Sequence, residues 1–305
     1  MSELHTALPA GAAAPTIPAP DADRDAIVAT AIGRLITGRA IPFLGPGALA
    51  GAAEAVGVPA SPEAVAAALN RFTMAPGRIR TNMWSVAQYI EQRRHRRTLV
   101  ANMADIFANP VPAGALHRAL AALDRLPMIV DTWYDGAMRE ALAVRGDWVE
   151  IQGVTRALET GDIWWRAYAP GGGEVTAADA GAAPLVLYKP HGAVVPARNF
   201  LVADSDYVEV LTEIDIQSPI PDTVVERRAG RSFVFLGCRF DDQMLRTYAR
   251  QIAKRSAGPH VALIDDPDAL TRNERRFLAD QMIVPVAMDL GTFTGRLEEA
   301  TAALA

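Results

Sequence analysis

His191 is the side chain in this sequence best suited to acid–base chemistry. It follows the apolar run at 185–188 and precedes Gly192, which is the pattern of a buried strand that ends in a turn. A neutral imidazole at such a strand end could act as a general base near pH 7. The alternative is a histidine that is only hydrogen-bonded within the turn, and the residues alone leave both roles open.

Acidic and hydroxyl side chains follow a second apolar run, 128–130, in the segment DTWYDG. Asp131, Thr132 and Asp135 would lie at the end of a strand, where a carboxylate can bind a ribose hydroxyl. The alternative role is local, because an aspartate just before a helix commonly caps its first turn. We expect one of these two roles for Asp135, ahead of a helix predicted over 136–144.

Gly45-Pro46-Gly47 follows a third apolar run, 41–44, and precedes an alanine-rich segment. A glycine turn between a strand and a helix can hold a phosphate on backbone amides near the helix N-terminus. Pro46 has no amide hydrogen, and the third glycine of the dinucleotide-binding fingerprint is missing. The turn is therefore either a phosphate-binding site or an ordinary connection.

The segment GCRFDD follows the most hydrophobic run of the chain, 232–236. Gly237 would let the backbone approach a ligand closely, and Arg239 could neutralise a phosphate. The alternatives are a solvated Arg239 and a helix cap at Asp241 or Asp242. Cys238 is predicted to be a small core residue.

These segments fit a series of strands that alternate with helices. Helical spacing begins near Arg24, a strand is predicted at 41–45, and further strands are predicted in PMIVDTWYD, WVEIQG, PLVLYKPHG, SFVFLGCRFDD, HVALIDD and MIVPV. Apolar strands that alternate with helices predict an α/β fold with a doubly wound parallel sheet. We expect a disordered Ala/Pro-rich tail at 1–23, one domain over 24–305, a helical insertion at about 52–126 and a surface loop at 170–184.

Composition excludes several classes of protein. The net charge of −5 does not favour nucleic-acid binding, and the one dense basic run, 91–97, reads as a solvated helix surface. A single cysteine excludes a disulfide within the chain and a cysteine-based zinc site, so no metal is expected. The longest apolar runs are too short to span a membrane, and we expect a cytoplasmic protein without membrane or nucleic-acid partners.

The order of these segments resembles the sirtuin-like (silent-information-regulator-like) domain family. A glycine turn after the first strand is followed by a helical insertion, then T-x-Y-D, K-x-HG and G-x-x-F-x-D. The resemblance covers about residues 25–300, and its most specific part is KPHGAVVPARNFLVADSDYVEVL at 189–211. It is strongest to the zinc-free bacterial branch, many of whose members are NAD-cleaving modules in antiphage defence.

The resemblance implies a Rossmann-like sheet that binds NAD over its carboxyl edge and chemistry at the nicotinamide–ribose bond. It places the pyrophosphate on Gly45 and Gly47, a ribose-facing base at His191, a ribose-side acid at Asp135, and phosphates or the distal ribose beside Gly237. The implied candidate site consists of His191 and Asp135 as catalytic residues and of Gly45, Pro46, Gly47, Thr132, Trp133, Gly192, Gly237 and Arg239 as nucleotide-binding residues.

The sequence departs from the family pattern at positions near the expected chemistry. Pro46 and Leu49 replace smaller residues of the glycine turn, and Arg239 replaces a serine. Trp133 stands where the family has the asparagine that contacts ribose and the attacking water. An indole offers one donor and no acceptor, and its bulk would fill a space the size of nicotinamide.

Three hypotheses of function follow from the sequence. The first is a protein that binds NAD or ADP-ribose, with weak, altered or lost cleavage. The second is an active NAD glycohydrolase, and the third is an interaction module without a ligand. A protein deacylase is not expected, because the four-cysteine zinc module is absent from this sequence. The sequence leaves open whether the chain forms homo-oligomers or works with a separate sensor protein.

Overall fold

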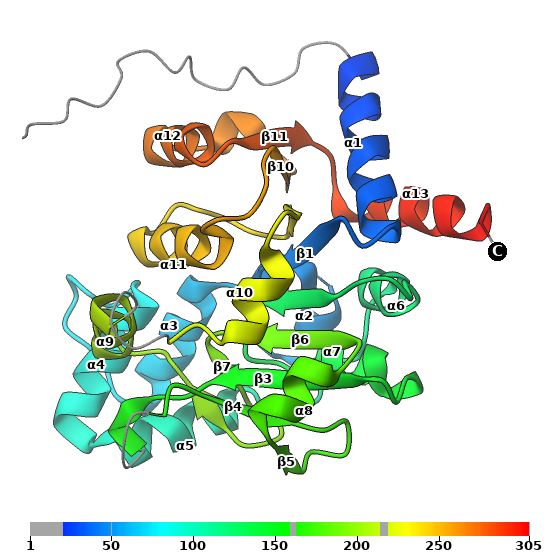
Figure 1. Cartoon of the computed structure of the whole chain (residues 1–305). Helices are drawn as coiled ribbons and strands as arrows, with labels where there is room; N and C mark the ends of the chain where they lie inside the picture. Colours follow the sequence, from blue (N-terminus) through cyan, green and yellow to red (C-terminus); the bar gives the residue numbers. More distant parts are fainter. Residues whose placement is uncertain (1–20, 50, 159–162, 214–218, 305) are drawn as a thin grey trace, which may run out of the picture.

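The computed structural model describes residues 21–49, 51–158, 163–213 and 219–304 (Figure 1). Within these ranges the chain forms a nine-stranded sheet in the order β11-β10-β9-β1-β2-β6-β3-β4-β5. The strands from β11 to β3 in this order are parallel, while β4 and β5 are antiparallel at one edge. Their bounds are β1 Ala40–Leu44, β2 Met128–Asp131, β3 Trp148–Gly153, β4 Trp165–Tyr168, β5 Glu174–Val175, β6 Leu185–Lys189, β9 Ser232–Leu236, β10 His260–Ile264 and β11 Ile283–Ala287.

Helices cover both faces of the sheet. Side chains of successive strand residues point to opposite faces, and in these strands both sets are apolar, so both faces need a cover. Phe43 of β1 and Phe235 of β9 face a core formed with α2–α5 and α9–α12, whereas Leu44 and Leu236 face a core formed with α1, α6, α7 and α13. The bounds of the helices outside the predicted insertion are α1 Asp21–Ile36, α7 Ala137–Ala141, α8 Ala177–Ala182, α9 Asp204–Glu213, α10 Asp222–Arg228, α11 Gln243–Ala253, α12 Arg272–Asp280 and α13 Leu290–Ala302. The predicted fold class, a Rossmann-like doubly wound α/β sheet, is confirmed.

The segment between β1 and β2 is helical, and its helices divide over the two faces of the sheet. Their bounds are α2 Ala52–Val56, α3 Pro62–Phe72, α4 Met83–Arg94, α5 Arg96–Ile106 and α6 Ala115–Ala121. The first four pack in one core, while α6 packs in the other core with α13. Helix α3 begins with Ser61 as its cap and Pro62 at its first position, since the Ser61 hydroxyl accepts a hydrogen bond from the Ala64 amide at 3.2 Å.

Two sequence predictions are wrong in detail. The segment 170–184 is not an irregular loop, because it contains β5 and α8, and Thr176 and Asp179 form a reciprocal capping box. The basic run 91–97 is not one helix surface, because the chain turns at His95 (φ 70°) between α4 and α5. Arg96 is buried, and its guanidinium contacts the Asp206 carboxylate at 2.9 Å.

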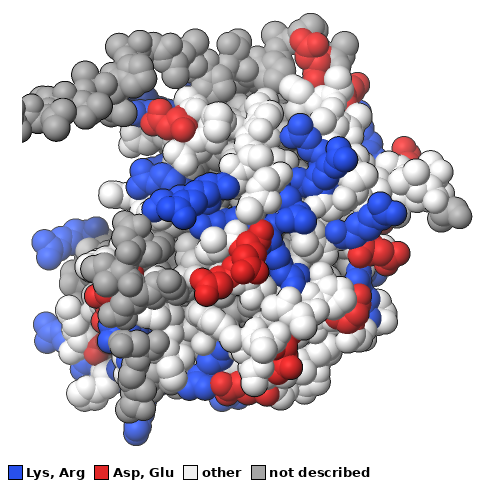
Figure 2. All heavy atoms as spheres, viewed as in Figure 1, with Lys and Arg blue, Asp and Glu red and all other residues white. Residues whose placement is uncertain are grey.

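Residues 1–20 of the predicted N-terminal tail lie outside the described residues. Its last three residues belong to α1, which begins at Asp21, so the first helix starts earlier than the sequence predicts. None of the helices in the described ranges combines the length and the apolar run needed to cross a bilayer. Figure 2 shows acidic and basic side chains interspersed on one face of the molecule, with Lys and Arg gathered over α11 and beside α1.

Candidate functional site

The candidate site is a pocket of about 350 Å³ at the carboxyl ends of β1 and β9. The chain leaves β1 toward β2 on one side and later continues with β9 on the other side of β1, so the strand order reverses here. Ligands of open α/β sheets bind in the crevice at such a reversal. The volume lies at the lower end of the range for small-molecule sites, which is about 300–1,000 Å³. We call this cavity the switch-point pocket.

Seven of the ten candidate residues line the switch-point pocket. They come from the ends of β1, β2, β6 and β9, and they are Gly45, Pro46, Gly47, Thr132, His191, Gly237 and Arg239. Ser61 and Glu63 at the start of α3 also line the pocket, and so does Tyr248 of α11. Asp135, Trp133 and Gly192 are not among the described residues that line it.

His191 presents a free hydrogen-bond acceptor. Its Nδ1 lies 3.1 Å from the carbonyl oxygen of Thr132, and because a carbonyl can only accept, Nδ1 carries the proton and donates. Its Nε2 is buried and has no hydrogen-bond partner in the described part of the chain. Burial, reinforced by the charge of Lys189, lowers the pKa of His191 to about 4, so the ring is neutral at pH 7. A ligand hydroxyl in the pocket could therefore donate to Nε2.

The glycine turn after β1 interlocks with the turn after β9. The Gly45 amide donates to the Leu236 carbonyl at 2.9 Å, and the Gly47 amide donates to the Gly237 carbonyl at 2.9 Å. A Cβ on Gly45 would lie 2.4 Å from the Gly237 oxygen, and one on Gly47 would lie 2.8 Å from it. Close backbone packing therefore requires both glycines. The two amides that the turn could offer a phosphate are already engaged, and Pro46 has none.

Arg239 is bound to a buried carboxylate. Its Nε and Nη2 donate to the two oxygens of Glu274 at 3.0 and 3.2 Å, while half of the Arg239 side chain stays exposed. Glu274 also accepts from the Phe240 amide, so the pair fixes the turn after β9 to α12. Arg239 is therefore exposed to solvent, as one alternative from the sequence expected, and is also paired with Glu274. The predicted cap at Asp242 is confirmed, because its Oδ1 accepts from the Met244 amide at 2.7 Å.

Trp133 points into the core. Its indole N–H donates to the Pro59 carbonyl at 2.8 Å, and its ring packs against Phe107 and Tyr134. Trp133 does not line the switch-point pocket, since the hydrogen bond to Pro59 and the aromatic neighbours hold the indole among the helices. Pro59 directly precedes the pocket-lining residue Ala60, so the indole supports the wall of the pocket from behind.

Asp135 and Gly192 have local roles in the structure. Asp135 is buried, and its Oδ1 accepts from the Ala137 amide at 2.8 Å in the turn before α7, whose N-cap is Gly136, so Asp135 is not itself the cap that the sequence offered as an alternative. Its Oδ2 has no partner in the described part of the chain. Gly192 has φ 75° and belongs to the hairpin of β7 (Gly192–Ala193) and β8 (Asn199–Phe200), where a Cβ would lie 2.3 Å from the Asn199 oxygen.

A buried ion pair lies beneath the candidate site. The Lys189 ammonium contacts the Asp131 carboxylate at 2.6 Å, and the two side chains are 1% and 5% exposed. Burial raises the pKa of Asp131 to about 6 against the opposing attraction of Lys189, so the carboxylate is ionised at pH 7. The sequence placed Asp131 at a strand end, but its pairing with Lys189 depends on β2 and β6 being neighbours.

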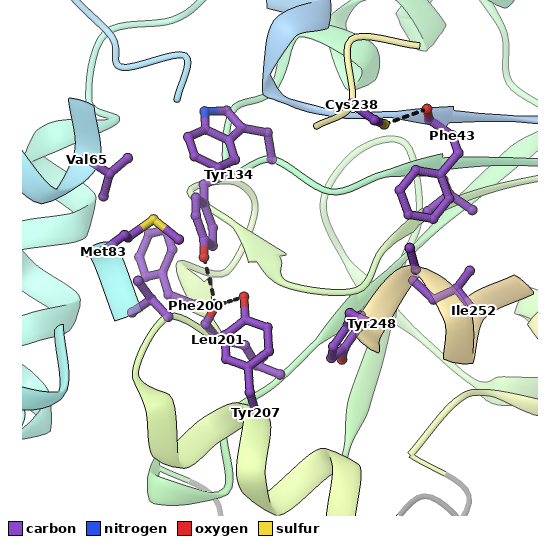
Figure 3. Close-up of a cluster of buried hydrophobic side chains, with 14 of the residues drawn as sticks. Phe43, Val65, Met83, Tyr134, Phe200, Leu201, Tyr207, Cys238, Tyr248 and Ile252 are labelled. Carbon is purple, nitrogen blue, oxygen red and sulfur yellow. Dashed lines mark hydrogen bonds between the residues drawn. The ribbon is translucent and has the colours of Figure 1, made fainter. Parts of the chain in front are cut away.

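Aromatic side chains surround His191. The hydroxyls of Tyr134 and Tyr207 both donate to the Leu201 carbonyl, at 2.8 and 3.2 Å, as Figure 3 shows. The rings of Tyr207 and Tyr248 meet the imidazole edge-on, with centroids 5.3 and 4.6 Å from it. These contacts hold the imidazole in one orientation, so the directions of its two nitrogens are fixed.

Sequence reasoning missed Glu63 and Tyr248 as pocket residues. Glu63 was visible as the first-turn acid of a helix, and Tyr248 as an apolar-face residue of α11. Nothing in the local pattern of either helix indicates that it faces the ends of β1 and β9, because that placement depends on tertiary packing.

The described residues contain no group of three or more His, Cys, Asp or Glu side chains arranged to hold a metal ion. A comparison with curated proteins found no match. A comparison with protein-family models found that the SIR2-like domain matches residues 127–286, which is just over half of the chain. This match extends from β2 to β11 and includes the His191 and Gly237 turns.

Proposed function

The chain belongs to the SIR2-like domain family, whose domains bind NAD, and from this premise we propose that it binds NAD or ADP-ribose in the switch-point pocket with weak, altered or lost cleavage of the nicotinamide–ribose bond. The proposal concerns the identity of the nucleotide and the fate of the glycosidic bond. The family alone supports only NAD-related binding or cleavage in general.

The observation that carries the proposal is the free Nε2 of His191. A buried polar atom without a partner is costly, and such atoms in native proteins usually meet water or a ligand. Nε2 lies at the end of β6, at the edge of the sheet where α/β folds bind nucleotides. A neutral imidazole acceptor suits a ribose hydroxyl, and the Thr132 side chain beside it already donates its own proton to the Leu44 carbonyl. Thr132 can therefore also accept from a ligand.

Two features support weak or lost cleavage. A general base is most effective when its pKa lies near the working pH, and burial has moved the pKa of His191 to about 4. The amide side chain that would position an attacking water is replaced by Trp133, whose single donor is engaged by Pro59. What remains is suited to holding a ribose rather than to activating a nucleophile.

Binding is tested by titrating the full chain with NAD and ADP-ribose in a calorimeter and by native mass spectrometry. We expect binding by the unmodified protein and roughly fivefold to hundredfold weaker binding by His191→Gln, since a lost buried hydrogen bond is worth roughly 1–3 kcal/mol. The matched control is His260→Gln, because His260 is also buried but does not line the pocket. If neither nucleotide binds the unmodified protein, the proposal is wrong and an interaction module without a ligand is the better description.

The second candidate function is an active NAD glycohydrolase. It is favoured by one observation, namely that Glu63 and Asp241 line the same pocket as His191 and could act on a water. Incubation with NAD and detection of free nicotinamide separates the two candidates. Sustained release that His191→Gln abolishes would establish the hydrolase, whereas binding without release supports the binding protein.

A further inference from the structure

Helix α1 borders an apolar groove at the edge of the sheet opposite the switch-point pocket. The groove has a volume of about 220 Å³ and lies between α1 and the amino ends of β9, β10 and β11. We propose that it is a homodimer interface, in which α1 of a second copy of this chain lies antiparallel against α1. This inference goes beyond the proposed function, because it concerns the other edge of the sheet and does not involve the nucleotide.

The groove is lined mainly by apolar groups. Phe233 and Val284 lie on its sheet side, and Ile27 and Thr30 lie on its helix side. The Thr30 hydroxyl donates to the Ala26 carbonyl at 2.8 Å, so it needs no partner from outside the helix. A second apolar groove, of about 430 Å³, runs along the other side of α1 against α13. Figure 1 shows α1 at one side of the molecule, with its first turns extending beyond the sheet. Apolar surface therefore borders α1 on both sides, and a protein partner would remove it from water.

Two charged side chains of α1 flank the groove without a partner. Asp23 and Arg34 make neither an ion pair nor a side-chain hydrogen bond among the residues that the structure describes. Asp25, on another side of the helix, differs in this respect, because it pairs with Arg296 of α13 at 2.7 Å. Arg34 lines the groove, and Asp23 lies one helical turn before the lining residue Ile27. An unpaired acid therefore lies at one end of the groove and an unpaired base at the other.

These two charges lie on one line along the helix. Asp23 and Arg34 are eleven residues apart, which corresponds to three helical turns plus about 20° and to a distance of about 16 Å along the axis. Ile27 and Thr30 lie between them on the same line. If a second α1 runs antiparallel about a two-fold axis between residues 28 and 29, each Asp23 meets the Arg34 of the other copy. In the same register each Ile27 meets the Thr30 of the other copy, whereas a parallel pair would place like charges together.

This match between the two halves of α1 identifies a second copy of the chain as the partner. A two-fold interface needs a surface that is complementary to itself, and here one register pairs opposite charges at both ends and a larger with a smaller side chain in the middle. The charges add specificity of register, while the apolar groove supplies the surface that is buried. Because the contact centres on one helix of 16 residues from each copy, we expect a weak dimer that depends on protein concentration.

The test is sedimentation velocity of the full chain at low salt over a wide range of concentrations. We expect a reversible equilibrium between monomer and dimer. Asp23→Arg and Arg34→Asp should each weaken the dimer about tenfold or more, because each substitution replaces an attraction by a repulsion and the two-fold axis makes it act twice. Glu54→Arg is the matched control and should leave the dimer unchanged, since Glu54 is an exposed acid of α2, which packs in the other core.

Two combinations of these substitutions should restore the dimer. The double variant Asp23→Arg/Arg34→Asp exchanges the two charges, so its dimer should be within about threefold of the unmodified one. An equimolar mixture of the two single variants should form a heterodimer, because the new arginine of one copy faces the new aspartate of the other, and the remaining Arg34 faces the remaining Asp23. Circular dichroism and melting curves check that each variant is folded.

Three results would overturn the inference. If the full chain is a monomer at every concentration, the groove is left to the segment 1–20 or to a different protein. If a dimer forms and neither single substitution weakens it, the copies associate through another surface. If the single substitutions weaken the dimer and neither combination restores it, the antiparallel register is wrong, because only that register pairs residue 23 with residue 34.

Discussion

The buried neutral state of His191 makes a quantitative prediction about acid stability. In the folded protein, burial lowers the pKa of this imidazole from 6.5 to about 4, because protonation would place a charge among Tyr207, Tyr248 and Lys189. The unfolded chain binds the proton more tightly, with a pKa near 6.5. Between these two values the unfolded state holds more protons, so the free energy of unfolding falls as the pH falls from 6.5 toward 4.

The size of the effect follows from the two pKa values. Lowering the pH from 7 to 5 protonates this histidine almost fully in the unfolded state and only slightly in the folded state, which costs about 2 kcal/mol of stability. His260 contributes a similar effect, since burial lowers its pKa to about 4 and its Nδ1 accepts from the Phe233 amide at 2.9 Å. The two histidines together should take away about 4 kcal/mol of stability between pH 7 and pH 5, and Asp131, whose pKa burial raises to about 6, should give back about 1 kcal/mol over the same range.

The assay is urea unfolding at pH 7 and pH 5 for the unmodified protein, His191→Gln and His260→Gln. For each protein we compare the decrease in the free energy of unfolding between pH 7 and pH 5, so a difference in stability at pH 7 does not affect the comparison. Glutamine does not titrate, so each variant should lose about 2 kcal/mol less than the unmodified protein. If His191→Gln shows the same pH dependence as the unmodified protein, His191 is not held neutral by burial and its role as a fixed acceptor is refuted.

Three further perturbations test the supports of the site. Gly45→Ala should lower the free energy of unfolding in urea by about 3 kcal/mol or more, because the new Cβ would lie 2.4 Å from a backbone oxygen. The control is Gly33→Ala, which should be neutral or stabilising, because no atom lies within 4 Å of the new Cβ. Equal costs for the two variants would contradict the interlocked turns. Asp131→Asn should cost about 3–5 kcal/mol by leaving Lys189 buried without its partner, and the double variant Asp131→Leu/Lys189→Met should recover much of that loss. Trp133→Phe keeps an aromatic ring but loses the hydrogen bond to the Pro59 carbonyl. We expect the free energy of unfolding to fall by about 1 kcal/mol and the backbone amides of residues 58–63 to exchange hydrogen faster. Unchanged exchange would show that the indole does not support this wall of the pocket.

The fold class and most strand positions could be predicted from the sequence, because they depend on local patterns. Apolar runs that end in glycine or polar turns predicted the parallel strands, and the cap at Ser61 is a local interaction that needs only neighbouring residues. The antiparallel edge formed by β4 and β5 was not predicted, since its strands are short and their pairing is not encoded in an apolar period.

The candidate site was predicted only in part. The sequence brought His191, Thr132 and the two glycine turns to the same edge of a sheet, and the structure places these residues around one pocket. Trp133 was predicted beside the ligand, but the direction of a side chain at a turn depends on which partner it finds, and here that partner is the Pro59 carbonyl.

Local patterns in the chain therefore predict the helices, the strands and the edge of the sheet that carries the site, because hydrophobic period and turn residues act over a few neighbouring positions. The groups that the pocket offers a ligand depend instead on contacts between distant parts of the chain. Two glycines that read as a phosphate site use their amides to join β1 to β9, and the single lining arginine among the described residues is held by a glutamate from α12. The fold decides which acceptor each hydrogen-bond donor meets, and here donor and acceptor come from residues far apart in the chain.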